Sequence, residues 1–173
     1  MRTGEDLTYV CRTCETKHHE LPLCFGPDAP ASWGAIPINE RPHRGSLTDD
    51  LCEIDAQYFF VRGRIEIPIV GSDQVFVWLT WSSLAESTFR RTKDLWVVSG
   101  REQEPPYFGW LNSVLPDYPN TMNLKLLVHT RPVGERPGFE LEPTEHPLAV
   151  EQRAGMSWER VHEIAHSFSA GGA

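Results

Sequence analysis

The first candidate for chemistry is a histidine pattern near the C-terminal end of the chain. Residues 162–166, His-Glu-Ile-Ala-His, have the H-E-x-x-H spacing, which places two imidazoles on one side of a helix with a glutamate beside them, as in zinc proteases. A catalytic zinc also needs a third protein ligand, and SFSAGGA, which follows His166, contains no His, Asp, Glu or Cys. Only an upstream residue such as His146 or Glu142 could supply it. We therefore interpret the pattern as the exposed polar flank of a helix.

A second candidate is the cysteine motif CRTCETKHH. Cys11 and Cys14 have C-x-x-C spacing, and His18 and His19 follow within reach of the same turn. Zinc prefers four sulfur or nitrogen ligands in a tetrahedron. The fourth ligand must come from farther along the chain, where the candidates are Cys52, Cys24 and His43. A closed site of this kind would be structural, whereas a redox dithiol and unligated thiols are the alternatives.

The third candidate is His146, which lies among the acidic residues Glu142, Glu145 and Glu151. The functional interpretation is an acid–base pair in a cleft. The simpler interpretation, which we favour, is a histidine at the start of a helix, where nearby acidic groups interact well with the helix N-terminus.

Two other groups could bind a ligand or a partner. Arg62 and Arg64 flank Gly63 and could clamp a carboxylate or phosphate, although a solvated sheet face is the more common meaning of such a pair. The loop EPPYFGWLNSVLPDYPNT is rich in aromatic residues, which either form a recognition surface or cover the sheet as a lid. These aromatic residues are Tyr107, Phe108, Trp110 and Tyr118.

Composition excludes several functional classes. The chain has 173 residues, 40% of them hydrophobic, which is enough for a buried core. A formal net charge of -8 argues against nucleic-acid binding, which needs a basic footprint, and against adsorption to anionic membranes. The longest apolar run, VFVWLTW, is far shorter than the roughly 20 residues that span a bilayer. With no secretory signal visible at its start, we expect a cytoplasmic protein whose cysteines are thiols or metal ligands.

Strands and helices that must position these residues can be predicted from periodicity. In residues 64–69, Ile65, Ile67 and Ile69 alternate with polar residues and proline, as expected for a half-buried strand. Residues 75–81, 123–130 and 139–143 are further candidate strands, and 75–81 is apolar enough to be covered on both faces. Ser83 to Glu86 forms a capping box for a helix towards residue 93. Helices are also expected over 147–154, ending at a glycine, and from Ser157 onwards.

These elements predict an α+β fold with a mainly antiparallel sheet and a few packed helices. We expect one domain over residues 1–173. Within it, residues 1–52 would be an irregular, cysteine-containing and zinc-stapled segment, and residues 53–173 would hold the sheet and helices.

Five stretches along the chain resemble, in order, the bacterial family known as domain of unknown function 2199. They are CRTCETKHHELPLCFGPDAP, LTDDLCEIDAQYFFVRGRIEIPI, PPYFGWLNSVLP, YPNTMNLKLLVHTRP and RPGFELEPTEHPLAVEQRAGMS. The family pattern implies Cys11, Cys14, His18 and Cys52 as the metal ligands, and the chain departs from it at Glu15, where the family tends to have glycine. No activity follows from the resemblance.

Two functional hypotheses remain. The first is a non-catalytic interaction or regulatory domain with a structural zinc ion and an unknown protein partner. The second is a small hydrolase-like enzyme that uses His146 with nearby glutamates, or the helix carrying His162, Glu163 and His166. A flat aromatic patch with exposed histidines would favour the first hypothesis, and a deep pocket where histidines meet carboxylates would favour the second.

Overall fold

The computed structural model describes residues 9–10, 17–18 and 21–170 and has an α+β fold. Its strands are β1 (Tyr9–Val10), β2 (Lys17–His18), β3 (Cys24–Phe25), β4 (Gly45–Leu47), β5 (Leu51–Ile54), β6 (Tyr58–Pro68), β7 (Val75–Leu84), β8 (Tyr107–Leu111), β9 (Lys125–His129) and β10 (Gly138–Leu141). Its helices are α1 (Ala31–Gly34), α2 (Arg41–Arg44), α3 (Glu86–Asp94), α4 (Pro147–Ala154) and α5 (Trp158–Ala170), with a 3-10 turn η1 at Arg101–Gln103.

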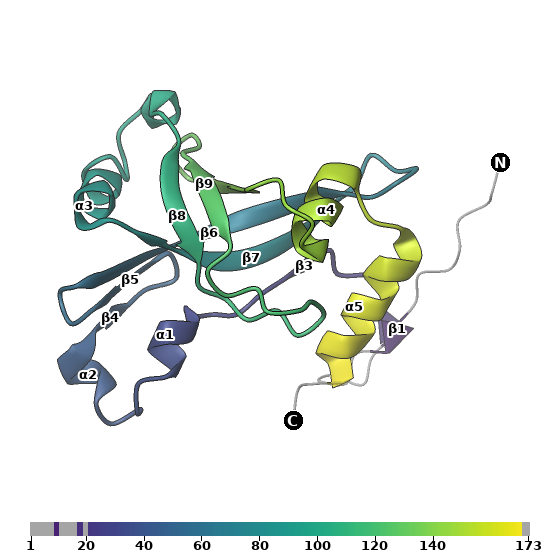
Figure 1. The fold of residues 1–173 in the computed structure, drawn as a ribbon, viewed down its shortest axis with the longest axis horizontal. Coiled ribbons are helices and arrows are strands. Elements are labelled where there is room, and N and C mark those ends of the chain that lie inside the picture. The colour runs from purple at the N-terminus through teal and green to yellow at the C-terminus, as the bar shows by residue number, and fades with distance from the viewer. Residues whose placement is uncertain (1–8, 11–16, 19–20, 171–173) are drawn as a thin grey trace.

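The main sheet has the strand order β3-β7-β8-β9-β10-β6-β5-β4, and β6 also pairs with β7. Strands β6 to β10 therefore form a closed ring. The pairings β10–β6 and β3–β7 are parallel, and the other strand pairings of this sheet within the described residues are antiparallel. The prediction of a mainly antiparallel sheet is confirmed. Figure 1 shows α4 and α5 together at one end of the molecule and α2, β4 and β5 at the other.

The β6–β7 hairpin is the centre of the fold. Ile65, Ile67 and Ile69 are almost fully buried, as their alternation predicted. Strand β7 has the predicted character of a covered central strand, because its consecutive residues Phe76, Val77 and Trp78 are all buried. The larger hydrophobic cluster fills the ring and extends to α4 and α5, where Val161 and Ile164 are completely buried. A smaller cluster lies beside α1 and β5 and contains Trp33, Ile36, Cys52, Ile54, Phe60 and Trp81.

All three predicted helices form, although α3 begins differently from the prediction. Its N-cap is Ala85, which makes no side-chain capping bond, because Ser83 belongs to the end of β7. Helix α4 has the predicted bounds and ends at Gly155, which has a positive φ of 85°. Ser157 caps α5 as predicted, since its hydroxyl accepts a hydrogen bond from the amide of Arg160 at 3.2 Å.

The interpretation of the aromatic segment as one long loop was wrong, because β8 lies inside it. Two features hide this strand in the sequence: the prolines at 105 and 106, and Gly109, a residue that weakens strands. Gly109 is required for close packing. A β-carbon there would lie 2.1 Å from the hydroxyl oxygen of Ser82, so only glycine lets β8 approach β7 this closely.

Within residues 9–10, 17–18 and 21–170, no helix is both long enough and apolar enough to cross a membrane.

Candidate interaction surface

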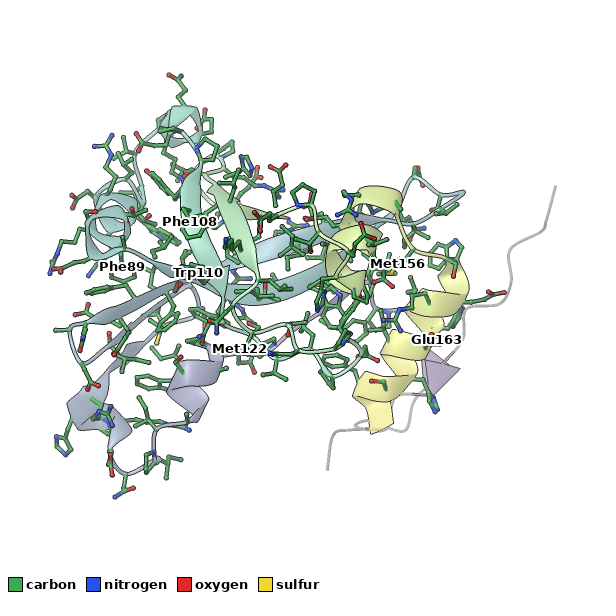
Figure 2. All side chains as sticks on the ribbon, in the orientation of Figure 1. Phe89, Phe108, Trp110, Met122, Met156 and Glu163 are labelled. Carbon is green, nitrogen blue, oxygen red and sulfur yellow. The ribbon has the colours of Figure 1, made fainter. Side chains whose placement is uncertain are left out.

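The outer face of β8 and β9 carries large apolar side chains in contact with solvent. Phe108 is 51% exposed, and Trp110 and Leu127 are each 40% exposed. Phe108 lies directly opposite Leu127 in the strand register, and Trp110 lies opposite Lys125. Figure 2 shows Phe108 and Trp110 on β8, and we call the surface formed by Phe108, Trp110 and Leu127 the aromatic face. Aromatic residues grouped in this way are typical of protein interfaces.

Strand pleating and ring contacts fix the aromatic face. Successive side chains of a strand point to opposite sides, so the buried Gly109 and Leu111 leave Phe108 and Trp110 on the outside. The two rings meet edge to face, with centroids 5.1 Å apart and an interplanar angle of 88°. The ammonium group of Lys125 lies 5.7 Å from the centre of the Trp110 ring. The face is therefore preorganised, which lowers the entropic cost of binding.

One side of the aromatic face is acidic. Glu140 on β10 lies opposite Leu127 and is itself exposed. Its carboxylate is 2.6 Å from the imidazole of His129. Glu142, also exposed, follows the end of β10 and bonds through its amide to the carbonyl of Lys125 at 2.9 Å. An apolar centre with acidic residues along one border suits a partner with apolar and basic groups.

The two tyrosines of the segment do not belong to this face. The Tyr107 hydroxyl donates a hydrogen bond to Glu104, and burial together with that carboxylate raises the pKa of Tyr107 to about 12. Tyr118 is buried; its hydroxyl donates to Glu151 and accepts from the indole N–H of Trp78 at 3.2 Å. Burial, followed by Glu151, raises the Tyr118 pKa above its ordinary value. Both tyrosines fix the segment against the body of the protein.

His146 has a structural position at the start of α4. Its Nδ1 accepts a hydrogen bond from the amide of Leu148 at 3.2 Å and so caps the helix. Its Nε2 lies 3.2 Å and 3.1 Å from the carbonyl oxygens of Pro119 and Asn120. Since Nδ1 accepts, Nε2 is the nitrogen that carries the proton and donates. Both ring nitrogens are therefore engaged, which agrees with the favoured interpretation of a histidine at the start of a helix.

The H-E-x-x-H residues lie on the exposed flank of α5. His162, Glu163 and His166 are all exposed, whereas Ile164 and Ala165 are buried on the core side. Glu163 is 3.4 Å from a guanidinium nitrogen of Arg160. Within the described parts of the chain, no three His, Cys, Asp or Glu residues are arranged to hold a metal ion.

The predicted zinc ligands are only partly covered by the structure. Cys11 and Cys14 lie outside the described residues, and His18 belongs to β2, where it pairs with Tyr9. Cys52 is 1% exposed in the smaller hydrophobic cluster, and burial raises the pKa of its thiol to about 12. The alternative ligand Cys24 is exposed. In Figure 1, β1 is drawn at the end of the molecule that holds α5, and β5 is drawn towards the opposite end. The four-residue site stays a prediction.

Arg62 and Arg64 have different roles despite their symmetric positions around Gly63. Arg62 is 8% exposed; it stacks 5.8 Å from the centre of the Trp81 ring and donates to the carbonyl of Pro27 at 3.1 Å. It therefore holds the segment before α1 against the sheet. Arg64 lines an open groove.

Comparison with known proteins identifies the family. No curated protein and no solved structure matches the chain. The model of the family described as "Uncharacterized protein conserved in bacteria (DUF2199)" matches residues 10–156, which is most of the chain and ends just before α5. The chain therefore belongs to the DUF2199 family of conserved bacterial proteins.

Proposed function

We propose that this protein is a non-catalytic interaction domain that binds a protein partner through the aromatic face. The observation that carries the proposal is the exposure of Phe108, Trp110 and Leu127 side by side on two paired strands. Exposing three adjacent large apolar side chains has a cost in solubility, and contiguous exposed apolar patches mark interaction sites.

The state of the candidate catalytic groups supports binding over hydrolysis. A general base needs a free nitrogen or carboxylate oxygen facing a substrate. Both nitrogens of His146 make hydrogen bonds within the protein, and Glu151 is shared between Tyr118 and Arg160. His162 and His166 are exposed on a helix flank, and in the described part of the chain no group of three His, Cys, Asp or Glu residues is arranged to hold a catalytic metal ion.

The partner's contact surface should be apolar with basic residues at its border. The protein carries a formal net charge of -8, and Glu140 and Glu142 border the aromatic face. Complementary charges of this kind mainly accelerate association and select the partner. The buried aromatic contacts then supply most of the affinity.

A structural zinc ion is the second part of the proposal. Cys11, Cys14 and His18 supply three suitable ligands at the spacing of a zinc knuckle. Cys52 is the predicted fourth ligand, with Cys24 and His19 as its competitors. A ligand must be a thiolate, so Cys52 could serve only if binding the metal overcame the burial that raises its pKa. Cys24, by contrast, is exposed.

Metal analysis of single variants of the full chain tests the zinc proposal. One zinc ion per chain is expected in the wild type, and Cys11→Ser and His18→Gln should lose most of it. Comparing Cys52→Ser with Cys24→Ser then identifies the fourth ligand. His162→Gln combined with His166→Gln is the matched control and should retain the metal. Purified wild-type protein without zinc, under conditions that keep thiols reduced, would contradict the proposal.

Site-specific photocrosslinking tests the interaction surface. A benzophenone amino acid at Phe108 should crosslink to one protein in bacterial cells, and Trp110→Ser in the same chain should abolish the crosslink. The same group at Ile38, which is 78% exposed in the α1–α2 connection, is the control. Equal crosslinking from Ile38, or a product containing a second copy of this chain, would contradict a specific heterologous partner.

A further inference from the structure

An open groove of about 530 Å³ lies on the outer side of the β6–β7 hairpin. Arg64 on β6 and Leu79 on β7 face each other in its floor, and Cys24 on β3 lies beside Val77. Residues around Trp96 and η1 form one wall, and the β9–β10 connection forms another. The volume is within the range of roughly 300–1,000 Å³ typical of small-molecule sites. No residue of the aromatic face lines the groove.

Arginines dominate the polar part of this groove. Arg64, Arg101 and Arg136 line it, together with the acidic residues Asp50 and Glu135. Arg136 uses its Nε to bind Asp50 at 2.6 Å, so its two terminal nitrogens are not needed for that bond. In an acidic protein, a concave site with more arginines than carboxylates is an unusual local environment and attracts anions.

Arg64 has only part of a carboxylate as its counter-charge. One oxygen of Glu66 is 3.2 Å from Arg64 and also accepts a hydrogen bond from Arg131 at 2.9 Å. The Nε of Arg64 is buried and has no hydrogen-bond partner among the described residues. A guanidinium has five donors, and burying one of them without an acceptor is costly. An additional anion beside Arg64 would balance the part of its positive charge that Glu66 leaves uncompensated.

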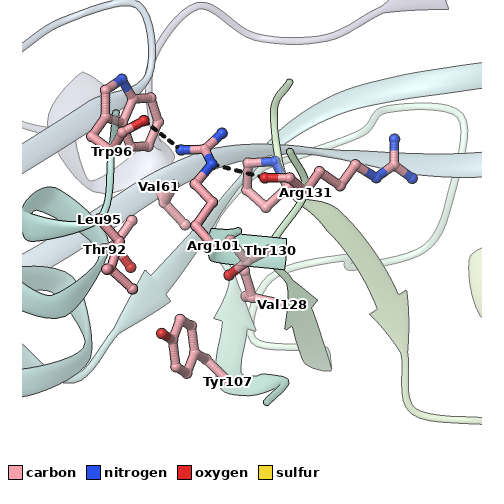
Figure 3. Close-up of a pocket in the computed structure, with 10 residues that line it drawn as sticks. Val61, Thr92, Leu95, Trp96, Arg101, Tyr107, Val128, Thr130 and Arg131 are labelled. Carbon is pink, nitrogen blue, oxygen red and sulfur yellow. Dashed lines mark hydrogen bonds between the residues drawn. The ribbon is translucent and has the colours of Figure 1, made fainter. Parts of the chain in front are cut away.

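Arg101 supplies a fixed positive charge next to Arg64 and Arg136. It is 6% exposed and donates only to backbone carbonyls, namely those of Arg131, Trp96, Pro132 and Glu135 at 2.8–3.1 Å. Figure 3 shows its guanidinium between Trp96 and Arg131, and it lies 5.2 Å from the centre of the Trp96 ring. Among the described residues, no carboxylate accepts a hydrogen bond from Arg101. Arg101 also holds the connection that carries Arg136, and so it positions that residue.

The groove offers an apolar surface beside these cations. Val77, Leu79 and the half-buried Trp96 line the same space. An inorganic ion would leave this surface unused, whereas a molecule with an anionic group and an apolar body would contact both parts. Guanidinium groups recognise carboxylate and phosphate through paired hydrogen bonds.

We propose that this groove binds a small organic anion, whose carboxylate or phosphate group lies between Arg64 and Arg136 and whose apolar body lies on Leu79 and Trp96. The proposal is independent of the protein-binding function assigned to the aromatic face. Carboxylate and phosphate both carry the negative charge that guanidinium groups bind, and the probes below distinguish between these two groups.

Four probes test the site on the full-length chain: 2-naphthoate, 1-naphthyl phosphate, neutral 2-naphthamide and inorganic phosphate. Calorimetry gives affinities, and alkylation of the exposed Cys24 at the groove wall reports occupancy in the wild type without any variant. One or both naphthyl anions should bind at least about tenfold more tightly than the amide and should slow the alkylation of Cys24. Binding of only one of them would assign the site to phosphates or to carboxylates.

Variants separate charge recognition from general adhesion. Arg64→Gln and Arg136→Gln should each weaken binding of the anion at least about tenfold, and thermal unfolding would verify that they fold. Arg90→Gln is the matched control, because Arg90 is an exposed arginine paired with Glu86 on α3. Equal affinity for the amide and the anions, unchanged binding in Arg64→Gln, or no protection of Cys24 by any probe would overturn the proposal.

Discussion

At the residue scale, the two described cysteines are in opposite environments. Cys52 is buried between aromatic side chains of the smaller cluster, and its thiol pKa is raised to about 12. Cys24 is exposed at the edge of the groove. Thiolate, rather than thiol, reacts with alkylating agents, so both the burial of Cys52 and its raised pKa should slow its alkylation.

We predict that iodoacetamide modifies Cys24 in the folded chain at pH 8 and leaves Cys52 intact. With a pKa of about 12, roughly one Cys52 side chain in ten thousand would be ionised at that pH. Mass spectrometry of the two peptides gives the rates, before and after treatment with a chelator. Modification of Cys52 at the rate of Cys24 would show that the smaller cluster is open.

Glu104 gives a prediction for the pH dependence of stability. Arg91 binds its carboxylate through two hydrogen bonds of 3.0 and 2.6 Å, Tyr107 donates a third, and together they lower the Glu104 pKa to about 2. A carboxyl group whose pKa is lower in the folded state stabilises the fold at pH values above its unfolded pKa. That contribution is lost as the pH falls towards the folded value.

The Glu104→Gln variant should therefore be less stable than the wild type at pH 6.5, and the difference should shrink between pH 4.5 and pH 2. Urea unfolding of both chains over this range measures it. The same experiment on Glu86→Gln, which removes a more exposed pair with Arg90, provides the comparison. A difference that stays constant down to pH 2 would mean that Glu104 is not ionised in the way described.

At the scale of elements, Gly63 shows how the ring of strands closes. A β-carbon at this position would lie 2.3 Å from the ring of Phe139 on β10, and β10 pairs with β6 one residue away, at Arg64. Strand β6 pairs continuously with β7 through this position, so Gly63 does not interrupt the strand. The glycine is needed for space between strands.

Gly63→Ala should destabilise the protein by about 1–3 kcal/mol, because the added methyl group overpacks the core. Combining it with Phe139→Leu should cost at least about 0.5 kcal/mol less than the sum of the two single changes. Gly34→Ala is the control, since no atom lies within 4 Å of the added carbon. Chemical denaturation measures all four variants, and simple additivity would contradict the close contact.

Helix α5 should be an integral part of the core even though the family match ends before it. Ile164→Ala should cost about 2–5 kcal/mol, as expected for a fully buried side chain. His162→Gln, on the exposed flank of the same helix, should change stability by less than about 0.5 kcal/mol. If unfolding experiments gave similar losses for both, α5 would not be packed as described.

At the scale of the whole molecule, periodicity predicted the elements whose burial is one-sided or complete. Strands β6 and β9 were visible because apolar residues alternate along them, and β7 because it is apolar almost throughout. Helices α4 and α5 were visible from the residues at their ends, Pro147, Gly155 and Ser157. Strand β8 was not, since its outward residues Phe108 and Trp110 are as apolar as its inward ones, and Gly109 is present for packing. The sequence therefore showed that this segment is rich in aromatic residues, but it did not show the strand that brings them together in the aromatic face.

The groove was less accessible still to sequence inspection. Arg64 was considered as an anion clamp together with Arg62, but the structure separates them and brings Arg64 near Arg101 and Arg136. These residues are far apart in the sequence, and their proximity depends on the closure of the ring. No local pattern carries that information. The zinc motif is the opposite case for three of its four predicted ligands, because Cys11, Cys14 and His18 lie close together in the sequence.

The affinity of the crosslinked partner for purified chains measures directly whether the aromatic face is the binding surface. Replacing Phe108 and Trp110 together by serine should weaken binding at least about 30-fold, since hot-spot residues contribute about 2 kcal/mol or more. Ile38→Ser should leave the dissociation constant unchanged. If the double variant folds normally and binds with wild-type affinity, the aromatic face is not the interaction site.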